Sequence, residues 1–312
     1  MIETYDLSKQ YNKDFWAVDG VNLQVQPGQI LALLGQNGAG KTTTVRMLTS
    51  LLSPTRGWAR VGGYDVTKHP KDVRANVGVL TEQHGLYMRM TGEEYLEYFG
   101  KVYGLDAATR TKQSKYLLDY FGLAEAAPRR SGEYSKGMKQ KLALARALIH
   151  DPSVLLLDEP TSAMDPESAQ LVRNEISRLR SSRRTIIICT HNLAEAEALS
   201  DQIAIIYRGK ILLNGTLEEL KRAVLGPVEY EATFAYEFDA GDLDLPPGVK
   251  LADRTTTSLR FRVDAPRESN PKLLMALTAQ NAPLLSFHEV PKKLEHVYLK
   301  TMADAQGVTY AS

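Results

Sequence analysis

The sequence predicts an α/β protein whose main sheet is mostly parallel. Three runs, at residues 30–34, 154–157 and 185–189, are apolar except for Thr185, and each is followed by a segment with the composition of a helix. A run that is apolar throughout suits a strand buried on both faces, and strands that alternate with helices favour a parallel sheet. The fold class therefore follows from this alternation.

The chain is expected to divide into a large and a small domain. Helix signals dominate between about residues 82 and 150, which predicts a helical subdomain inserted into the α/β body. The pattern changes again near Gly226-Pro227, after which strand-like alternation returns. We predict an α/β body over residues 1–225 and a small α+β accessory domain over residues 226–312, a division that suits this chain length.

Several elements of the body follow from local patterns. Alternating apolar residues from Val21 to Val25 predict a strand, which Pro27-Gly28 ends. Residues 43–52 follow a glycine-rich turn and have the composition of a helix. Residues 203–207 and 210–213 are joined by Arg-Gly and predict a hairpin, which gives the parallel sheet an antiparallel β edge.

The helical subdomain and the accessory domain carry their own signals. Thr91-Gly-Glu-Glu94 has the spacing of a capping box, and apolar residues at helical spacing follow it over 95–103. Alternation over 259–263 predicts a strand, whereas the apolar spacing of 273–277 and 294–302 predicts helices. The accessory domain is therefore expected to mix both kinds of element.

Composition excludes several classes of protein. The formal net charge of +1 offers no bulk attraction to nucleic acid or to an anionic membrane, so no nucleic-acid partner is expected. The single cysteine, Cys189, rules out an intrachain disulfide and favours a reducing compartment. The first ten residues lack the features of a signal peptide, and no stretch reaches the ~18 apolar residues of a membrane span. We expect a chain that is soluble by itself.

The segment Gly35-Gln-Asn-Gly-Ala-Gly-Lys-Thr42 lies between a predicted buried strand and a predicted helix. Glycines let successive backbone amides wrap a phosphate without side-chain clashes, and the following helix adds its positive end. In such a P-loop the lysine holds the β- and γ-phosphates and the Thr42 hydroxyl ligates Mg²⁺. The predicted nucleotide-binding residues are Gly35, Asn37, Gly38, Ala39, Gly40, Lys41, Thr42 and Thr43.

Two carboxylates end the apolar run at 154–157. Asp158 suits the coordination of Mg²⁺, and Glu159 is placed to orient or deprotonate a water that attacks the γ-phosphate. Acidic residues also follow strands simply because the chain emerges into solvent. Together with a P-loop, however, the pair indicates nucleotide hydrolysis.

At this point the sequence resembles one family, the ATP-binding subunits of ABC transporters, over residues 1 to about 220. Tyr134-Ser-Lys-Gly-Met-Lys-Gln140 resembles the signature sequence of that family, and Ser162-Ala-Met-Asp165 resembles its D-loop. His191 matches the switch histidine, and Tyr11 matches the aromatic residue that stacks on adenine. The resemblance implies a P-loop NTPase fold of the ABC cassette type.

The resemblance also implies roles for these residues. Ser135 and Gly137 face the γ-phosphate of a nucleotide that a second copy holds, Asp165 joins the nucleotide-binding set, and His191 bonds the γ-phosphate. Taken by itself, Ser135 is also a plausible helix N-cap and His191 a solvated residue at a strand end. The usual Leu-Ser-Gly-Gly-Gln signature is changed, since Lys136 and Met138 replace a glycine and the glutamine.

Two assignments stay open between neighbouring residues. Phe15 or Trp16 offers a stacking face as well as Tyr11 does. The resemblance implies a Mg²⁺-ligating glutamine within residues 77–83, and here Glu82 or Gln83 occupies that place, either of which supplies an oxygen ligand.

The implied function is an ATP-hydrolysing subunit, with ATP and Mg²⁺ as its ligands, that works as a homodimer and powers a separate integral-membrane permease. It would lie peripherally at the cytoplasmic face of a prokaryotic cell membrane. The stretch 84–92 and the domain 226–312 resemble the ABC-2, drug- and lipid-exporting branch, which implies export. The alternative is an ABC ATPase that acts on a ribosomal or DNA complex. The cargo is not encoded in this chain.

Overall fold

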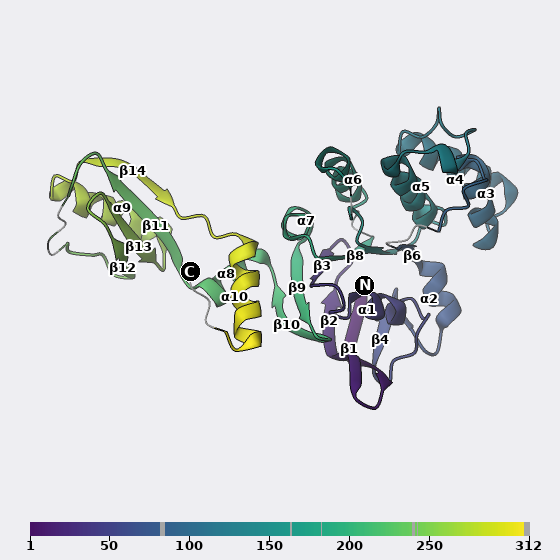
Figure 1. Cartoon of the computed structure of the whole chain (residues 1–312), viewed down its shortest axis with the longest axis horizontal. Coiled ribbons are helices and arrows are strands. Elements are labelled where there is room, and N and C mark those ends of the chain that lie inside the picture. The colour runs from purple at the N-terminus through teal and green to yellow at the C-terminus, as the bar shows by residue number, and fades with distance from the viewer. Residues whose placement is uncertain (82–84, 163, 182, 239–240, 242, 309–312) are drawn as a thin grey trace. The chain divides into compact units, whose positions relative to one another are not determined.

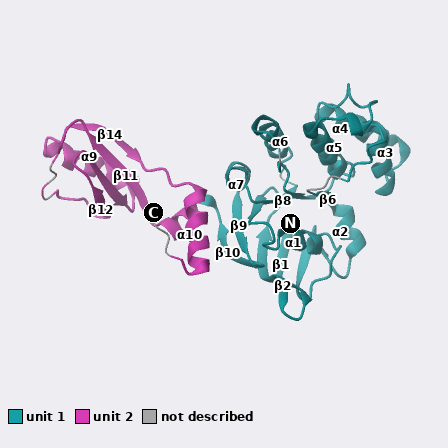
Figure 2. Ribbon diagram, in the orientation of Figure 1, with its two compact units in different colours: residues 1–217 teal, residues 218–312 magenta. Residues whose placement is uncertain are grey.

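The computed structural model describes residues 1–312 except 82–84, 163, 182, 239–240, 242 and 309–312. It forms two compact units, Met1–Leu217 and Glu218–Ser312 (Figure 2). The helix α8 (Leu217–Leu225) begins at this boundary, whereas the sequence placed the boundary at the end of the same helix. In the second unit, Lys292 Nζ and Lys300 Nζ donate to the carbonyls of Leu225 and Val224 at 3.0 and 2.8 Å. These bonds tie the end of α8 to the rest of that unit.

A six-stranded sheet in the described part of the first unit carries the site (Figure 1). Its strands, in spatial order, are β10 (Lys210–Gly215), β9 (Gln202–Tyr207), β3 (Ile30–Leu34), β8 (Thr185–Thr190), β7 (Val154–Asp158) and β6 (Val77–Leu80). Every neighbouring pair is parallel except β9 and β10, which form the predicted antiparallel hairpin. The predicted fold class, a mostly parallel sheet with an antiparallel edge, is confirmed.

A second, antiparallel sheet of the first unit was largely missed by the sequence analysis. Its strands, in spatial order, are β2 (Phe15–Val25), β1 (Ile2–Asn12), β4 (Arg56–Val61) and β5 (Tyr64–Asp65). Only part of β2 was predicted. Polar residues and several register shifts interrupt the alternation in β1, so its period-2 signal is weak.

Most helices of the first unit begin at a residue whose side chain caps the first turn. The helices of this unit are α1 (Lys41–Leu48), α2 (Pro70–Asn76), α3 (Gly92–Val102), α4 (Ala107–Tyr120), the 3₁₀ turn η1 (Ser131–Glu133), α5 (Lys136–Leu148), α6 (Pro166–Arg178) and α7 (Leu193–Leu199). Such a cap is present at α3, α4, α5, α6 and α7, whereas α1 and α2 have no side-chain cap. The capping box of α3 is confirmed, because Thr91 N donates to Glu94 Oε2 at 2.9 Å and Glu94 N donates to Thr91 Oγ1 at 3.1 Å. The helix expected at 43–52 is α1, which starts and ends earlier.

The core of the first unit lies on both faces of the six-stranded sheet. Alternate residues of one strand, such as Leu155 and Leu156, belong to different apolar clusters and are fully buried. One of these clusters continues into the helical subdomain, where α3, α4 and α5 lie side by side around Tyr95 and Phe121 (Figure 1). The subdomain therefore shares its core with the sheet that carries the site.

The second unit is an antiparallel sheet with helices, as predicted for an α+β domain. Its strands are β12 (Val249–Arg254), β13 (Ser258–Val263), β11 (Val228–Phe234) and β14 (Leu284–Glu289), in spatial order. Its remaining helices are α9 (Pro266–Ala279) and α10 (Leu294–Gln306). Leu259, Phe261 and Val263 of β13 are fully buried with Leu273 and Leu277 of α9. The strand at 259–263 and the two predicted helices are confirmed.

His150, just after α5, makes the stability of the first unit depend on pH. Its ring stacks on Tyr103 with 3.7 Å between ring centroids. Burial lowers the pKa of His150 from 6.5 to about 4, opposed in part by the Val77 backbone and the Asp151 carboxylate. The unfolded chain therefore takes up this proton at a higher pH than the folded chain does, and stability falls as the pH drops from about 6.5 towards 4.

We expect this proton to remove about 3 kcal/mol of unfolding free energy at pH 4 relative to pH 7.5. The His150→Phe variant keeps a ring on Tyr103 and loses that share of the pH dependence. Urea unfolding at several pH values between 7.5 and 4 gives the unfolding free energy of both proteins. Carboxylates that the two proteins share contribute equally, so the difference between the two proteins reports on His150. An equal loss of unfolding free energy on acidification in both proteins would contradict the prediction.

Candidate functional site

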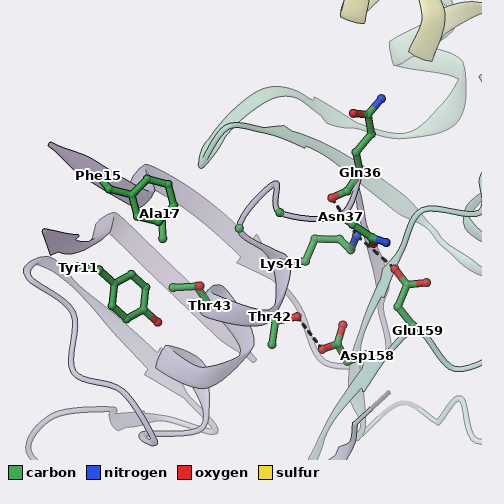
Figure 3. A pocket seen from close by; sticks show the side chains of 12 residues that line it. Tyr11, Phe15, Ala17, Gln36, Asn37, Lys41, Thr42, Thr43, Asp158 and Glu159 are labelled. Atoms are coloured by element: carbon green, nitrogen blue, oxygen red, sulfur yellow. Dashed lines mark hydrogen bonds and ion pairs between the residues drawn. The ribbon is translucent and has the colours of Figure 1, made fainter. Parts of the chain in front are cut away.

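A cavity of about 290 Å³ lies at the carboxyl ends of the parallel strands (Figure 3). Tyr11 and Phe15 of the antiparallel sheet line one side, and Asp158 and Glu159 at the end of β7 line the other. Its remaining lining residues are Ala17, Gln36, Asn37, Gly38, Gly40, Lys41, Thr42 and Thr43. The cavity thus gathers most of the predicted P-loop with residues more than a hundred positions away in sequence.

The glycines of the P-loop meet separate steric demands. Gly38 has a φ of +82° and nothing within 4 Å of the place where a Cβ would stand, so it needs glycine for its backbone angle. A Cβ on Gly35 would collide with the carbonyl of Ile206 in β9, so this position must stay bare for close packing. Gly40, with φ of 113°, is the N-cap of α1 and offers no side-chain cap. The first amides of α1 are therefore left for an anion.

Lys41 is held inside the cavity by oxygen atoms. Its Nζ donates to the carbonyls of Gly35 at 2.6 Å and Gln36 at 3.3 Å, and lies 3.2 Å from Glu159 Oε1. The side chains of Lys41 and Glu159 are only 5% and 8% exposed. A buried charge needs a partner, and these oxygens provide it in this structure.

Thr42 and Asp158 present oxygen atoms to the same cavity. The Thr42 hydroxyl donates to Asp158 Oδ2 at 3.0 Å (Figure 3). A hydroxyl and a carboxylate are hard donors of the kind that Mg²⁺ prefers, and Mg²⁺ in nucleotide sites completes its shell with phosphate and water. This pair therefore fits the metal. The two residues predicted as a further ligand, Glu82 and Gln83, lie outside the described residues.

Glu159 occupies an unusual backbone conformation between its two partners. Its φ is 51°, in the left-handed region, and its amide donates to the carbonyl of Cys189 at 2.8 Å. Its Oε2 lies 2.8 Å from Nδ1 of His191, which follows β8 and is 53% exposed. The structure thus joins Lys41, Glu159 and His191 in a single chain of polar contacts.

The structure narrows the choice of a stacking residue. Tyr11 and Phe15 both line the cavity and are about half exposed. Trp16 does not line it, and the Arg56 guanidinium lies 5.3 Å from the centre of its ring. Tyr11 and Phe15 therefore remain as candidates for contact with a base.

The signature residues and the D-loop lie elsewhere. Ser135 is the N-cap of α5 and accepts from Met138 N at 3.2 Å, and Asp165 is the N-cap of α6 and accepts from Ser168 N at 2.9 Å. Hydrogen bonds with Ser168, first of all from its backbone, lower the pKa of Asp165. Gly137 lies next to the start of α6, because a Cβ added to Gly137 would stand 3.8 Å from Ser168 Oγ. In the described part of one chain, the residues that line the cavity do not include Ser135, Gly137 or Asp165.

Cys189 on β8 is another titratable group near the site. Its thiol is fully buried, and burial raises its pKa well above the ordinary value. It stays protonated and acts as a small core residue.

A parallel sheet with a phosphate-binding loop after β3 and two carboxylates after β7 defines the class of P-loop NTPases. A model of the family described as ABC transporter matches residues 18–162. The chain belongs to this family: it is an ATP-binding, ATP-hydrolysing cassette of the ABC transporter type.

Among known proteins, the chain is 42% identical over 224 residues to the ABC transporter ATP-binding protein NatA of Bacillus subtilis, covering 70% of this chain and 91% of that protein. It is 36% identical over 303 residues to the daunorubicin/doxorubicin resistance ATP-binding protein DrrA of Streptomyces peucetius, covering 96% and 91%. The linearmycin resistance ATP-binding protein LnrL of Bacillus subtilis is 30% identical, with coverage of 96% and 97%. The last two matches extend over the second unit as well.

Solved structures show the same fold. An ATP-binding subunit of an ABC transporter superposes with a TM-score of 0.66 at 30% identity, covering 72% of this chain and 94% of that one. The ATP-binding cassette MJ0796, described as a dimer in a post-hydrolysis state bound to ADP and phosphate, superposes with a TM-score of 0.63 at 23% identity. The match covers 70% of this chain and 99% of that one. The predicted ABC cassette fold is confirmed.

Proposed function

We propose that this chain is the ATP-hydrolysing subunit of an exporter and that it powers a separate membrane permease. One observation carries the proposal: Lys41, Asp158 and Glu159 meet around one cavity, whereas Ser135 and Gly137 do not line it. One copy therefore presents half of the nucleotide site that the family pattern describes. The other half is expected from a second copy.

The residues of the cavity would divide the work of hydrolysis. Lys41 would bind the β- and γ-phosphates in place of its present oxygen partners, and Thr42 and Asp158 would hold Mg²⁺, which would neutralise charge on the phosphates. Glu159 accepts a proton from the attacking water, a step worth ~10²–10⁴ in rate. His191, 2.8 Å from Glu159, orients that carboxylate. Tyr11 or Phe15 stacks on adenine.

ATP would also close the dimer. The N-terminus of α5, with Ser135 and Gly137, is a positive helix end suited to the γ-phosphate held by the other copy. Reversing a 1:99 balance between open and closed forms needs about 5.5 kcal/mol of preference for the closed form. A few charge-assisted hydrogen bonds of ~1.5–3 kcal/mol each reach that value. Hydrolysis removes these bonds and lets the pair reopen.

A groove on the first unit supports docking to a permease. It has a volume of about 470 Å³ and lies between the end of α1, α2, β6 and the end of α3. Leu51 and Val102, which line it, are 70% and 61% exposed. An apolar groove of this kind suits an apolar segment of a partner. Among the residues that the structure describes, none of the helices has the length and apolar character needed to cross a membrane.

The relatives favour export over the ribosomal or DNA alternative. Two of those that match most of the chain are named for resistance to daunorubicin/doxorubicin and to linearmycin, and a third relative is a bacitracin transport protein. These relatives are bacterial, which supports a place at the cytoplasmic face of a bacterial membrane, reached through the permease.

A membrane-binding experiment tests the proposal. Membranes of the native host, stripped of peripheral proteins, are expected to bind the wild-type protein and to stimulate its turnover of Mg·ATP. Val102→Asp places a charge in the groove and should abolish both effects without changing turnover in solution. Met275→Asp on α9 is the control, because Met275 is 72% exposed and lies outside the groove. Equal binding and stimulation of Val102→Asp would contradict docking through this groove, and a wild-type protein without ATP turnover would overturn the function.

A further inference from the structure

The turn that follows β7 is held by buried side chains from two helices. On one side, the amide of Gln140 in α5 donates to the carbonyl of Pro160. On the other side, the hydroxyl of Thr161 donates to Oε1 of Glu195 in α7 at 2.8 Å. Gln140, Thr161 and Glu195 are 3%, 7% and 1% exposed. These contacts hold the two residues that directly follow Glu159, the residue assigned to activate water.

Glu159 has a conformation that requires such support. Its φ of 51° lies in the left-handed region, which is rare and unfavourable for a residue with a side chain. Strained conformations of this kind persist only where the surrounding structure determines them. Contacts that fix Pro160 and Thr161, directly after Glu159, therefore help to hold the backbone of Glu159 in this conformation.

The environment of Glu195 affects its ionisation. Burial raises the pKa of its carboxyl group, whereas the nearby hydroxyls of Thr190 and Thr161 act in the opposite direction. Thr190 directly precedes His191, and Thr161 lies two positions after Glu159. The carboxyl group of Glu195 accepts one hydrogen bond among the described residues, from Thr161 on the Glu159 side of the 2.8 Å contact between Glu159 and His191. Burying a carboxyl group is unfavourable unless it is hydrogen-bonded. The bond from Thr161 satisfies this condition for Oε1 of Glu195.

We propose that Glu195 and Gln140 are positioning residues, which clamp the turn Pro160-Thr161 and thereby hold the Glu159 carboxylate in place for hydrolysis. Neither side chain lines the nucleotide cavity, so both act through Glu159. This inference rests on the proposed function, because it assigns the chemistry to Glu159. Gln140 lies on the helix that begins at Ser135, so the clamp joins the signature helix of a chain to the catalytic carboxylate of that same chain.

Two substitutions at Glu195 separate positioning from simple filling of space. Glu195→Gln keeps an oxygen that accepts from Thr161, whereas Glu195→Met keeps a similar volume and removes the acceptor. We expect Glu195→Met to lower kcat about 10- to 100-fold, as small displacements of a catalytic group do, with little change in the KM for ATP. Glu195→Gln should recover most of the wild-type kcat. Thr161→Val removes the other end of the bond and should show the same loss.

The double variant Glu195→Met/Thr161→Val tests whether the two side chains act together. If they form one clamp, its kcat falls no further than that of either single variant. Binding of ATP, measured by equilibrium titration, and urea unfolding are recorded for each variant, so that lost folding is separated from lost positioning. A kcat in Glu195→Met equal to that of the wild type, or a loss that follows the unfolded fraction alone, would overturn the inference. An inactive wild-type protein would instead overturn the proposed function.

Discussion

Replacing Glu159 by glutamine is expected to stop ATP turnover, leave ATP bound and trap the protein as a dimer. The variant keeps the shape of the side chain but cannot accept a proton from water, so the rate should fall by about 10²–10⁴. Glutamine also carries no charge to hold Lys41, whose Nζ lies 3.2 Å from Glu159 Oε1 in the present structure. Lys41 is then freer to bind phosphate, and the closed form gains stability.

Gel filtration with and without Mg·ATP measures this outcome, together with release of inorganic phosphate. The wild-type protein should elute mainly as a monomer under turnover, and Glu159→Gln as a dimer when ATP is present. Glu268→Gln, an exposed carboxylate on α9, is the matched control and should behave as the wild type does. A Glu159→Gln protein that is saturated with ATP and still monomeric would contradict the two-copy site.

Replacing Lys41 by methionine is expected to weaken the folded protein and to abolish ATP binding. Lys41 and Glu159 form a buried pair, with side chains 5% and 8% exposed. Removing one member of such a pair leaves the other charge buried without its partner. We expect a loss of about 3 kcal/mol in unfolding free energy, at the low end for a broken buried pair because His191 still faces the other oxygen of Glu159.

The double variant Lys41→Met/Glu159→Gln should recover much of this stability, because it removes the orphaned charge. Urea unfolding of the two single variants and the double variant gives the coupling between the two side chains. Mg·ATP at about a hundred times its Kd should stabilise the wild type by about 2.7 kcal/mol and leave Lys41→Met unchanged. Additive losses in the double variant would show that the ion pair contributes nothing to the fold.

The parallel sheet was predictable because its strands are buried on both faces. Residues 30–34 and 154–157 are apolar throughout, and short runs of this kind are typical of parallel strands that are buried on both faces. Most of the antiparallel sheet of β1, β2, β4 and β5 was not predictable, since its partly exposed strands tolerate polar residues on one side. Pairing between Ile2 and Val61, for example, joins segments with no local signal that links them.

The phosphate-binding loop and the two carboxylates of the candidate site were predictable, because these residue types rarely occur together in such patterns without a chemical role. A glycine-rich loop ending in Lys41-Thr42, and a buried strand ending in Asp158-Glu159, each need their residues for a chemical reason. The choice between stacking residues was not predictable, because Tyr11, Phe15 and Trp16 are all aromatic. Only the alternation of β2 in space turns Phe15 towards the cavity and leaves Trp16 outside it.

The sequence by itself determined the class of fold, the phosphate-binding loop and the carboxylates, because glycine, lysine and acidic side chains at these spacings have few other uses. The tertiary structure decided which of them meet. It pairs Lys41 with Glu159 and Glu159 with His191, twists the backbone at Glu159 and brings Gln140 and Glu195 around the turn that follows. These contacts join residues from separate strands and helices, and their distances depend on how the whole core packs, which no local pattern records.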